Sequence, residues 1–355
     1  MNNHNRKYIH VLGHKDSSCK FYRDLIKIYT ESNMFDLNNY IFVTPYKSVY
    51  DEIFKFYKNI IFLDKKNIFK TYLNYNNIII LHSITFSKLR IIFTRKSALK
   101  HCILRTWGHD INRSQNTLKS RIGNYFYSKK LKYFLAIGCS NLVDMINVKQ
   151  YVSKEMKTIH LSYTYLSKNQ FNYLCEIKSK YNPNNTKYRV IIGHSGDKAD
   201  NHKAIIDDLL KFTNRDIEFI FLLSYGDKNY CNELKEYIYL TLRDNATIIE
   251  HFMSLNEYVK LIKSVDVIIL DSPFSSSLGM LSYAIFFERK IYVNRNGIIG
   301  KAIKECNAEI NYTDELSTIT YNEFIKPKFD KKLMVLHNIR PVEEIAQGWK
   351  KIENL

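Results

Sequence analysis

Short runs of β-branched and aromatic residues alternate with helical stretches along almost the whole chain. In its first half such runs cover residues 8–12, 40–43, 60–63, 78–81, 102–106 and 134–137, with helical stretches that include 21–30 and 141–151. Consecutive parallel strands need a crossover connection, which is usually a helix, so this alternation is typical of α/β domains. The pattern therefore predicts an α/β fold with parallel sheets.

A second series of the same kind follows a polar, turn-forming stretch at residues 178–186. Its expected strands cover 188–192, 219–223, 247–249, 267–270 and 291–293, and its expected helices include 202–212, 230–242 and 280–287. Ser254 and Glu257 form a capping-box pattern at the start of another helix. With 355 residues, the chain is expected to form two doubly wound, Rossmann-like domains, residues 1–180 and 181–355. The final helix could return to the N-terminal domain.

The positive charge lies almost entirely in the first of these halves. Residues 1–180 hold 30 lysines and arginines against 11 acids, whereas the remaining residues hold 23 against 24. A basic half attracts an anionic partner, which could be nucleic acid, phospholipid head groups or a phosphorylated substrate.

Basic and large apolar residues are interleaved in two segments of this half, 88–105 and 119–133. Such mixtures suit an anionic bilayer surface. The alternatives are a solvated helix face and nucleic acid, although no known nucleic-acid motif is present. No window approaches the roughly 18 apolar residues of a spanning helix. We therefore expect a protein that is cytosolic, or that lies on a membrane without crossing it.

Small polar residues follow three expected strands of the second half. In doubly wound sheets ligands bind beyond the carboxyl ends of strands, where a helix N-terminus favours anions. The candidate nucleotide-binding residues in these loops are Gly193, Ser195, Gly196, Asp197, Tyr225, Gly226, Ser275, Ser276, Ser277 and Gly279. GxGxxG and GxxxxGK[ST] are both absent, so the loops are neither a dinucleotide fingerprint nor a P-loop.

Polar turns also follow strands of the first half. His14, His82 and Asp110 each come directly after, or within a few residues of, an apolar run. A His or Asp that faces a substrate cleft can act as a general base towards a hydroxyl group. We take Asp110 as the first candidate, with His14 and His82 behind it. For each residue a purely structural role remains the alternative.

No D-x-D sequence occurs in the chain. Enzymes that transfer sugars with the help of a divalent metal commonly hold it with such carboxylates. We therefore expect a metal-independent reaction without a cofactor, in which helix dipoles, amides and a cation such as Arg295 neutralise a diphosphate leaving group.

Several of these motifs, in this order, resemble one family. The chain is similar to the bacterial TDP-4-acetamido-4,6-dideoxygalactose:lipid-linked acceptor transferases, glycosyltransferase family 56, known from enterobacterial common antigen synthesis. The resemblance covers some 340 positions. It rests on Ile9-His-Val-Leu-Gly13 with Asp16, His82, Trp107-Gly108-x-Asp110, Gly193-x-Ser-Gly-Asp197, Asn201-His202, Tyr225-Gly226, Tyr258, Asp266, Leu278-Gly279, Asn294-Arg-Asn296 and Gln347-Gly-Trp349.

The resemblance implies a GT-B hexosyltransferase, in which two doubly wound domains face a central cleft. It implies a TDP-sugar donor on the C-terminal domain, with Tyr258 among the donor-binding residues, and a polyprenyl-diphosphate-linked glycan as acceptor for the N-terminal domain. Two departures bear on the donor sugar. Ser275 and Ser276 stand where family members carry glutamines, and His109 stands where they carry a small residue.

The expected function is transfer of a 4-amino-4,6-dideoxyhexose-type sugar from a TDP donor to a lipid-linked glycan of a bacterial surface polysaccharide. One alternative is a GT-B transferase that uses a UDP- or GDP-sugar for O-antigen or capsule. The other is a basic membrane or nucleic-acid-binding protein without enzymatic activity.

Overall fold

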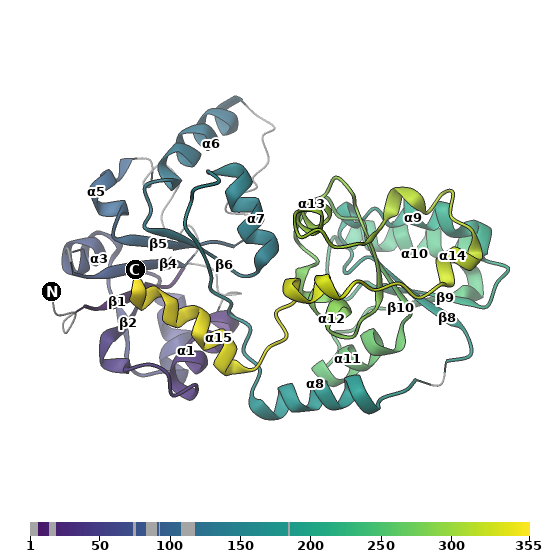
Figure 1. The fold of residues 1–355 in the computed structure, drawn as a ribbon, viewed down its shortest axis with the longest axis horizontal. Helices are drawn as coiled ribbons and strands as arrows, with labels where there is room; N and C mark the ends of the chain where they lie inside the picture. Colours follow the sequence, from purple (N-terminus) through teal and green to yellow (C-terminus); the bar gives the residue numbers. More distant parts are fainter. Residues whose placement is uncertain are drawn as a thin grey trace. The chain divides into compact units, whose positions relative to one another are not determined.

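The chain forms two compact units. The computed structural model describes residues 6–13, 19–73, 76–82, 91, 93–107, 118–183 and 185–355. The first unit consists of residues 1–168 and 340–355, and the second of 169–339 (Figure 1). The division thus falls before the helix α8 (Lys168–Lys180), not at the expected residue 180. The polar stretch at 178–186 connects two elements of the second unit.

The first unit is built on a sheet of seven parallel strands in the order β3-β2-β1-β4-β5-β6-β7. β1 lies between β2 and β4, and Ile9 pairs with Ile41 on one side and with Ile79 on the other. The strands are β1 (Tyr8–Val11), β2 (Tyr40–Thr44), β3 (Ile60–Phe62), β4 (Ile78–His82), β5 (Cys102–Arg105), β6 (Ala136–Cys139) and β7 (Thr158–His160).

Helices cover both faces of this sheet, as Figure 1 shows. One core contains residues of α1 (Cys19–Glu31), α2 (Lys47–Phe56) and α15 (Val342–Lys350). The other contains residues of α3 (Lys65–Tyr72), α5 (Lys96–Leu99), α6 (Leu118–Leu131) and α7 (Leu142–Tyr151). Two apolar faces explain why the strands are almost continuously hydrophobic.

The helix α15 is the last helix of the chain, yet it belongs to the first unit. Its Trp349 is fully buried, and the indole Nε1 donates to the carbonyl oxygen of Ser162, 2.7 Å away. Ile345 and Ala346 enter the same core as Tyr22 of α1. The first sheet therefore has one face completed by residues from the far end of the chain.

The second unit is built on six parallel strands in the order β10-β9-β8-β11-β12-β13. Both units thus share the doubly wound order 3-2-1-4-5-6, and this confirms the predicted α/β class. The strands are β8 (Tyr188–Ile192), β9 (Ile217–Leu222), β10 (Ala246–Ile249), β11 (Val267–Leu270), β12 (Lys290–Val293) and β13 (Asn311–Tyr312).

Helices alternate with these strands. They are α9 (His202–Leu209), α10 (Lys228–Leu242), α11 (Leu255–Ser264), α12 (Leu278–Phe286), α13 (Ile298–Glu305) and α14 (Tyr321–Ile325). α11 begins at the expected capping box: the Glu257 amide donates to Ser254 Oγ, and the Glu257 carboxylate accepts from the Ser254 amide. In the described parts of the chain, no helix has the length and hydropathy needed to cross a bilayer.

Candidate active site

A cavity of about 450 Å³ opens beyond the carboxyl ends of β8, β9 and β11 in the second unit. Since the strands are parallel, these ends lie along one edge of the sheet, where doubly wound domains bind ligands. Five of the predicted nucleotide-binding residues line it, together with two others. The lining residues are His194, Ser195, Asp197, Tyr225, Gly226, Asp227 and Ser276.

Two predicted glycines join the loops that follow β8 and β9. Gly196 and Gly226 pair as an isolated parallel bridge: the Gly196 amide donates to the Tyr225 carbonyl oxygen at 2.7 Å, and the Asp227 amide donates to that of Gly196 at 3.0 Å. Gly226 has φ +133°, and a Cβ there would overlap the backbone of Gly196. Only glycine allows the two loops to approach this closely.

A buried carboxylate organises the β8 loop. Asp200 is 1% exposed and accepts hydrogen bonds from the backbone amides of His194 (3.0 Å) and Ser195 (3.3 Å). Its Oδ1 and Oδ2 also lie 3.0 and 2.8 Å from His194 Nδ1. These two amides therefore point at Asp200 and not into the cavity.

The His194 imidazole also sets the charge of Asp200. Burial alone would raise the pKa of this carboxyl, but the hydrogen bonds and the positive charge available from His194 outweigh burial and lower the pKa below its ordinary value. Asp200 is therefore ionised at neutral pH. An ionised carboxylate accepts the proton on Nδ1, so Nε2 is the ring nitrogen on the side of Ser195 Oγ, 3.5 Å away.

Asp197 and Asp227 cap helices at the rim of the cavity. The Asp197 carboxylate accepts from the Ala199 amide at 2.9 Å, and the Asp227 carboxylate accepts from the Tyr230 amide at 2.9 Å. Asp197 is exposed, so its side chain remains accessible to a ligand. Its observed bond is that of an ordinary helix cap.

The N-terminus of α12 supplies the third wall of the cavity. Ser277, its N-cap residue, makes no capping hydrogen bond, and its Oγ is buried without a partner. The first-turn amides of any helix have no partner within the helix, and here no side chain caps them. Ser275 and Ser276 lie in the preceding loop, and Ser276 Oγ is 3.4 Å from Ser272 Oγ. This arrangement suits an anionic ligand.

Gly279, in the first turn of α12, differs from the other two glycines. A Cβ at Gly279 would meet no heavy atom within 4 Å, and the residue is exposed. The fold therefore does not require glycine at this position, whereas close approach of a ligand to the helix N-terminus would.

An exposed pair of aromatic rings lies beside the cavity. Tyr225 and Phe252 are 51% and 76% exposed, and their ring planes lie within 7° of each other at a centroid distance of 6.1 Å. Parallel exposed rings can stack on a planar ligand such as a nucleobase. The sequence analysis overlooked Phe252, because it follows β10 in a loop without glycine or serine-rich character.

Two predicted donor-binding residues lie elsewhere. Arg295 donates from Nε to Asp314 at 2.7 Å and from Nη2 to Glu315 at 2.9 Å, and these carboxylates raise its pKa. Its charge is already compensated, contrary to the expectation of a cation available for a diphosphate. Tyr258 packs edge-to-face against Tyr283 of α12, and burial raises its pKa; it does not line the cavity.

Asp271, which the sequence analysis also overlooked, connects the loops behind the cavity. Its Oδ2 accepts from Asn201 Nδ2 at 2.8 Å, and its Oδ1 accepts from the hydroxyl of Thr313. Its carbonyl oxygen accepts from Asn294 Nδ2 at 3.2 Å. Loops that follow four strands are thereby joined at one buried residue, three of them through its carboxylate and the fourth through its backbone carbonyl oxygen.

In the first unit, His82 occupies the core and not an accessible site. Its ring is fully buried, with Nε2 2.9 Å from His10 Nδ1 and Nδ1 bonded to the hydroxyl of Tyr163, and it stacks on Trp349. Burial, with the nearby His10 and Arg105, lowers its pKa well below the ordinary value. This geometry does not support the prediction that His82 is a general base. His14 and Asp110 lie outside the described residues.

Arg105, one of the basic residues of the 88–105 segment, is likewise fully buried. It donates to the carbonyl oxygen of Leu161 at 2.6 Å and lies 3.9 Å from the centroid of the Tyr163 ring. Arg105 therefore stabilises the core and contributes nothing to a membrane-facing surface.

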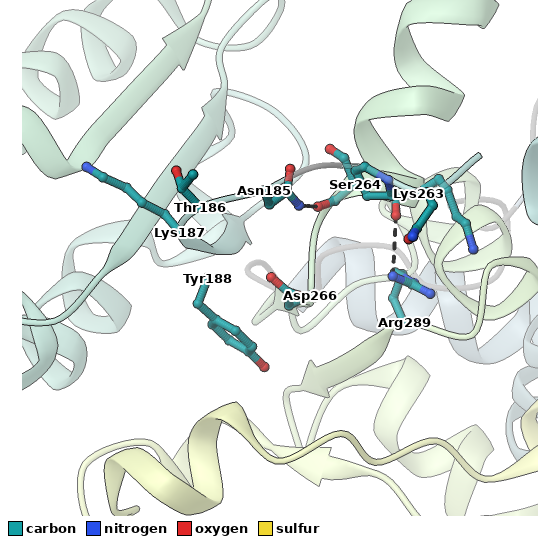
Figure 2. Close-up of a pocket in the computed structure, with 10 residues that line it drawn as sticks. Asn185, Thr186, Lys187, Tyr188, Lys263, Ser264, Asp266 and Arg289 are labelled. Atoms are coloured by element: carbon teal, nitrogen blue, oxygen red, sulfur yellow. Dashed lines mark hydrogen bonds between the residues drawn. The ribbon is translucent and has the colours of Figure 1, made fainter.

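A second cavity, of about 460 Å³, lies at the opposite edge of the second sheet (Figure 2). Among its lining residues, Tyr188 is the first residue of β8, and Asp266 and Arg289 directly precede β11 and β12. Arg289 Nη1 donates to the carbonyl oxygens of Lys263 and Val265 at the end of α11, and Asp266 accepts from the Arg189 amide. Arg289 thus caps the C-terminal end of α11, and Asp266 bonds to the start of β8. Both side chains therefore have a structural role.

The described residues contain no group of three or more His, Cys, Asp or Glu side chains that could hold a metal ion. The side chains that line the cavity of the second unit include an imidazole, the hydroxyl groups of two serines and a tyrosine, and the carboxylates of Asp197 and Asp227.

Comparisons with known proteins agree with this geometry. Residues 5–324 match the family model described as 4-alpha-L-fucosyltransferase glycosyl transferase group 56. No curated protein matches the sequence significantly.

Solved structures of glycosyltransferases share the fold. HepE of Anabaena in complex with UDP superposes with a TM-score of 0.60 at 10% identity, covering 99% of this chain and 100% of that one. A glycosyltransferase of Rickettsia africae gives 0.56 at 14% identity, covering 99% and 94%. Sucrose-phosphate synthase of Thermosynechococcus elongatus gives 0.56 at 9% identity, covering 98% of each chain. These similarities confirm the GT-B fold.

Proposed function

The chain belongs to glycosyl transferase group 56, and we propose that it transfers a 4-amino-4,6-dideoxyhexose-type sugar from a TDP-sugar to a polyprenyl-diphosphate-linked glycan. It is a glycosyltransferase of the GT-B fold. The reaction would take place at the cytoplasmic face of a bacterial inner membrane, in the synthesis of a surface polysaccharide.

The cavity of the second unit carries the donor part of this proposal. The uncapped N-terminus of α12, with the buried and unpartnered hydroxyl of Ser277, fits an anionic diphosphate. Tyr225 and Phe252 offer parallel exposed rings beside it for the nucleobase. HepE, which shares the fold, has been solved with UDP and with UDP-glucose. A UDP- or GDP-sugar is therefore the alternative donor.

The first unit carries the acceptor part of the proposal. A lipid-linked acceptor lies in an anionic membrane, and the first unit contains nearly all of the excess positive charge. Large apolar side chains are exposed on α6, namely Ile122, Tyr125 and Phe126, which are 51–57% exposed. Lys129 and Lys132 are exposed near them. Exposed rings and cations together suit the interface of a bilayer.

Mass spectrometry of a synthetic lipid-linked acceptor, incubated with the enzyme and a panel of TDP-, UDP- and GDP-sugars, tests the proposal. We expect the acceptor mass to increase by the mass of an aminodideoxyhexosyl residue with the TDP donor. Transfer from a UDP- or GDP-sugar alone would support the alternative donor. Transfer to a water-soluble glycan at the same rate as to the lipid-linked one would contradict a membrane acceptor.

A further inference from the structure

His194 is the one imidazole among the residues that line the second unit's cavity. The ring is held from one side by Asp200, whose two carboxylate oxygens lie 3.0 and 2.8 Å from Nδ1. Tyr225 packs edge-on against it at a centroid distance of 6.3 Å. A carboxylate and an aromatic ring thereby fix the orientation of the imidazole.

Several amides of the His194 loop already have partners near the ring. The amides of His194 and Ser195 donate to Asp200, that of Gly196 donates to the Tyr225 carbonyl oxygen, and that of Ala199 donates to Asp197. The side chains of His194, Ser195 and Asp197 in this loop line the cavity, and the Ser195 hydroxyl donates to Asp200 at 3.4 Å. Arg295 donates to Asp314 and Glu315 and does not line the cavity.

The cavity also brings His194 together with the N-terminus of α12. Ser276, one residue before the N-cap Ser277, lines the same cavity as His194. A diphosphate bound at the helix N-terminus would therefore lie within the cavity that the imidazole faces. Because Nδ1–H is bonded to an ionised carboxylate, a ring that carries its second proton on Nε2 can donate a hydrogen bond to a phosphate oxygen there.

We propose that His194, oriented by Asp200, donates a hydrogen bond from Nε2 to the phosphate oxygen of the donor that leaves during sugar transfer. The inference rests on the proposed nucleotide-sugar donor. In the reaction the acceptor hydroxyl oxygen bonds to the anomeric carbon, and the bond from that carbon to the diphosphate oxygen breaks. The electron pair remains on the diphosphate, and the hydroxyl proton passes to a base or to solvent. His194 changes no covalent bond; it stabilises the charge that develops on the leaving oxygen.

Calorimetric titration of the whole protein with TDP, TMP, UDP and UMP tests this role. The bond involves the distal phosphate, so His194→Gln should weaken binding of the preferred diphosphate at least tenfold and change binding of the matching monophosphate less than twofold. kcat should fall more than KM changes, because the charge on the leaving oxygen is largest in the transition state. His251→Gln, an exposed histidine of the same unit, is the matched control and should change neither affinity.

Equal loss of mono- and diphosphate affinity, or no loss, would overturn the role of His194. A parent protein that binds neither TDP nor UDP would instead overturn the proposed donor, and the inference with it. Thermal unfolding shows whether each variant folds. If His194→Gln does not fold, a protection experiment on the parent protein tests the same role. Diphosphate should protect His194 from diethyl pyrocarbonate, as read by mass spectrometry, and monophosphate should not. Equal protection by both ligands would overturn the proposal.

Discussion

At the scale of single residues, two glycines lead to predictions about substitution, and buried histidines lead to a prediction about pH. Gly226 has a left-handed backbone and no room for a Cβ, whereas Gly279 has room for one in the first turn of a helix. The fold therefore requires glycine at position 226. At position 279 the fold has room for a larger residue, so only a bound ligand would require glycine there. Burial lowers the pKa of His10, His82 and His202, so the stability that these rings contribute depends on pH.

The two glycines make a matched pair of alanine variants. Gly226→Ala should lower the free energy of unfolding by roughly 2 kcal/mol or more, because the new Cβ overlaps Gly196 and φ is positive. Gly279→Ala should leave stability unchanged or raise it by up to about 1 kcal/mol, yet weaken diphosphate binding. Urea unfolding and calorimetry measure the two effects. Unchanged nucleotide affinity in Gly279→Ala would remove the α12 N-terminus from the donor site.

Acid should destabilise the protein before its carboxylates titrate. Burial lowers the pKa of His10 to about 3 and that of His202 to about 4, and the pKa of His82 is lowered well below its ordinary value. Since the folded-state values lie below the unfolded value of about 6.5, the unfolded chain takes up protons first. The stability that these rings contribute above pH 6.5 is therefore lost progressively as the pH falls from about 6.5 towards their folded-state pKa values.

The expected loss is roughly 1 kcal/mol for each of the three rings at pH 5.5 relative to neutral pH. Urea unfolding at pH 7.5 and 5.5 measures it. His251→Gln, at an exposed position, should leave the difference unchanged. A free energy of unfolding that is the same at both pH values would contradict the burial of neutral imidazoles.

The site was predictable from the sequence only in part. Small polar residues after an apolar run indicate a loop at a strand end, and five residues predicted in such loops, three of them glycine or serine, do line the cavity. Partners distant in the sequence leave no such signal. The ion pairs of Arg295 with Asp314 and Glu315 depend on how β12 and β13 pair, so the charge of Arg295 looked available. His82 looked accessible for the same reason, because Tyr163 and Trp349, which cover it, lie far along the chain.

At the scale of elements, α6 is the feature that a membrane surface would use. The helix exposes Ile122, Tyr125 and Phe126, and the ammonium of Lys129 lies 5.4 Å from the Tyr125 ring centroid. Its inner side packs through Tyr127 and Leu131. One helix therefore combines a buried face with an exposed face that is both apolar and basic.

Reversing charges on this helix should weaken membrane binding. Lys129→Glu with Lys132→Glu should reduce co-sedimentation with vesicles that contain anionic lipid by more than tenfold, because each lysine contributes about 1 kcal/mol near an anionic surface. Turnover on a short, water-soluble acceptor should change little. Lys55→Glu with Lys58→Glu makes the same charge change at the end of α2, on the opposite face of the sheet, and serves as control. Equal losses of vesicle binding in both double variants would show that only the net charge of the protein matters, and not the position of the lysines.

Element prediction succeeded where periodicity was strong. β8 and β11 match their expected ranges, and the other expected strands of the second unit differ by one or two residues at their ends. β7 (Thr158–His160) and β13 (Asn311–Tyr312) were not expected, because they are short and polar edge strands of their sheets. Their strand state comes from pairing with β6 and β12, which a local pattern does not contain.

At the scale of the whole molecule, the chemistry is expected to run without a divalent metal. The sequence has no D-x-D, and the described residues bring no three potential ligands together. Full turnover should therefore survive excess EDTA, with product formation followed by mass spectrometry. If EDTA abolishes turnover and Mg²⁺ or Mn²⁺ restores it, leaving-group stabilisation by α12 and His194 alone is wrong.

The placement of α15 has a consequence for the order in which the chain matures on the ribosome. When residues 1–168 have been synthesised, the apolar surface that receives Trp349 has no cover, and the whole second unit must be made before α15 emerges. The second unit, whose residues are contiguous, can complete its core first, although it is translated later. A released chain that ends at residue 339 should therefore contain a protease-resistant second unit and a first unit that is still open to cleavage and to chaperones.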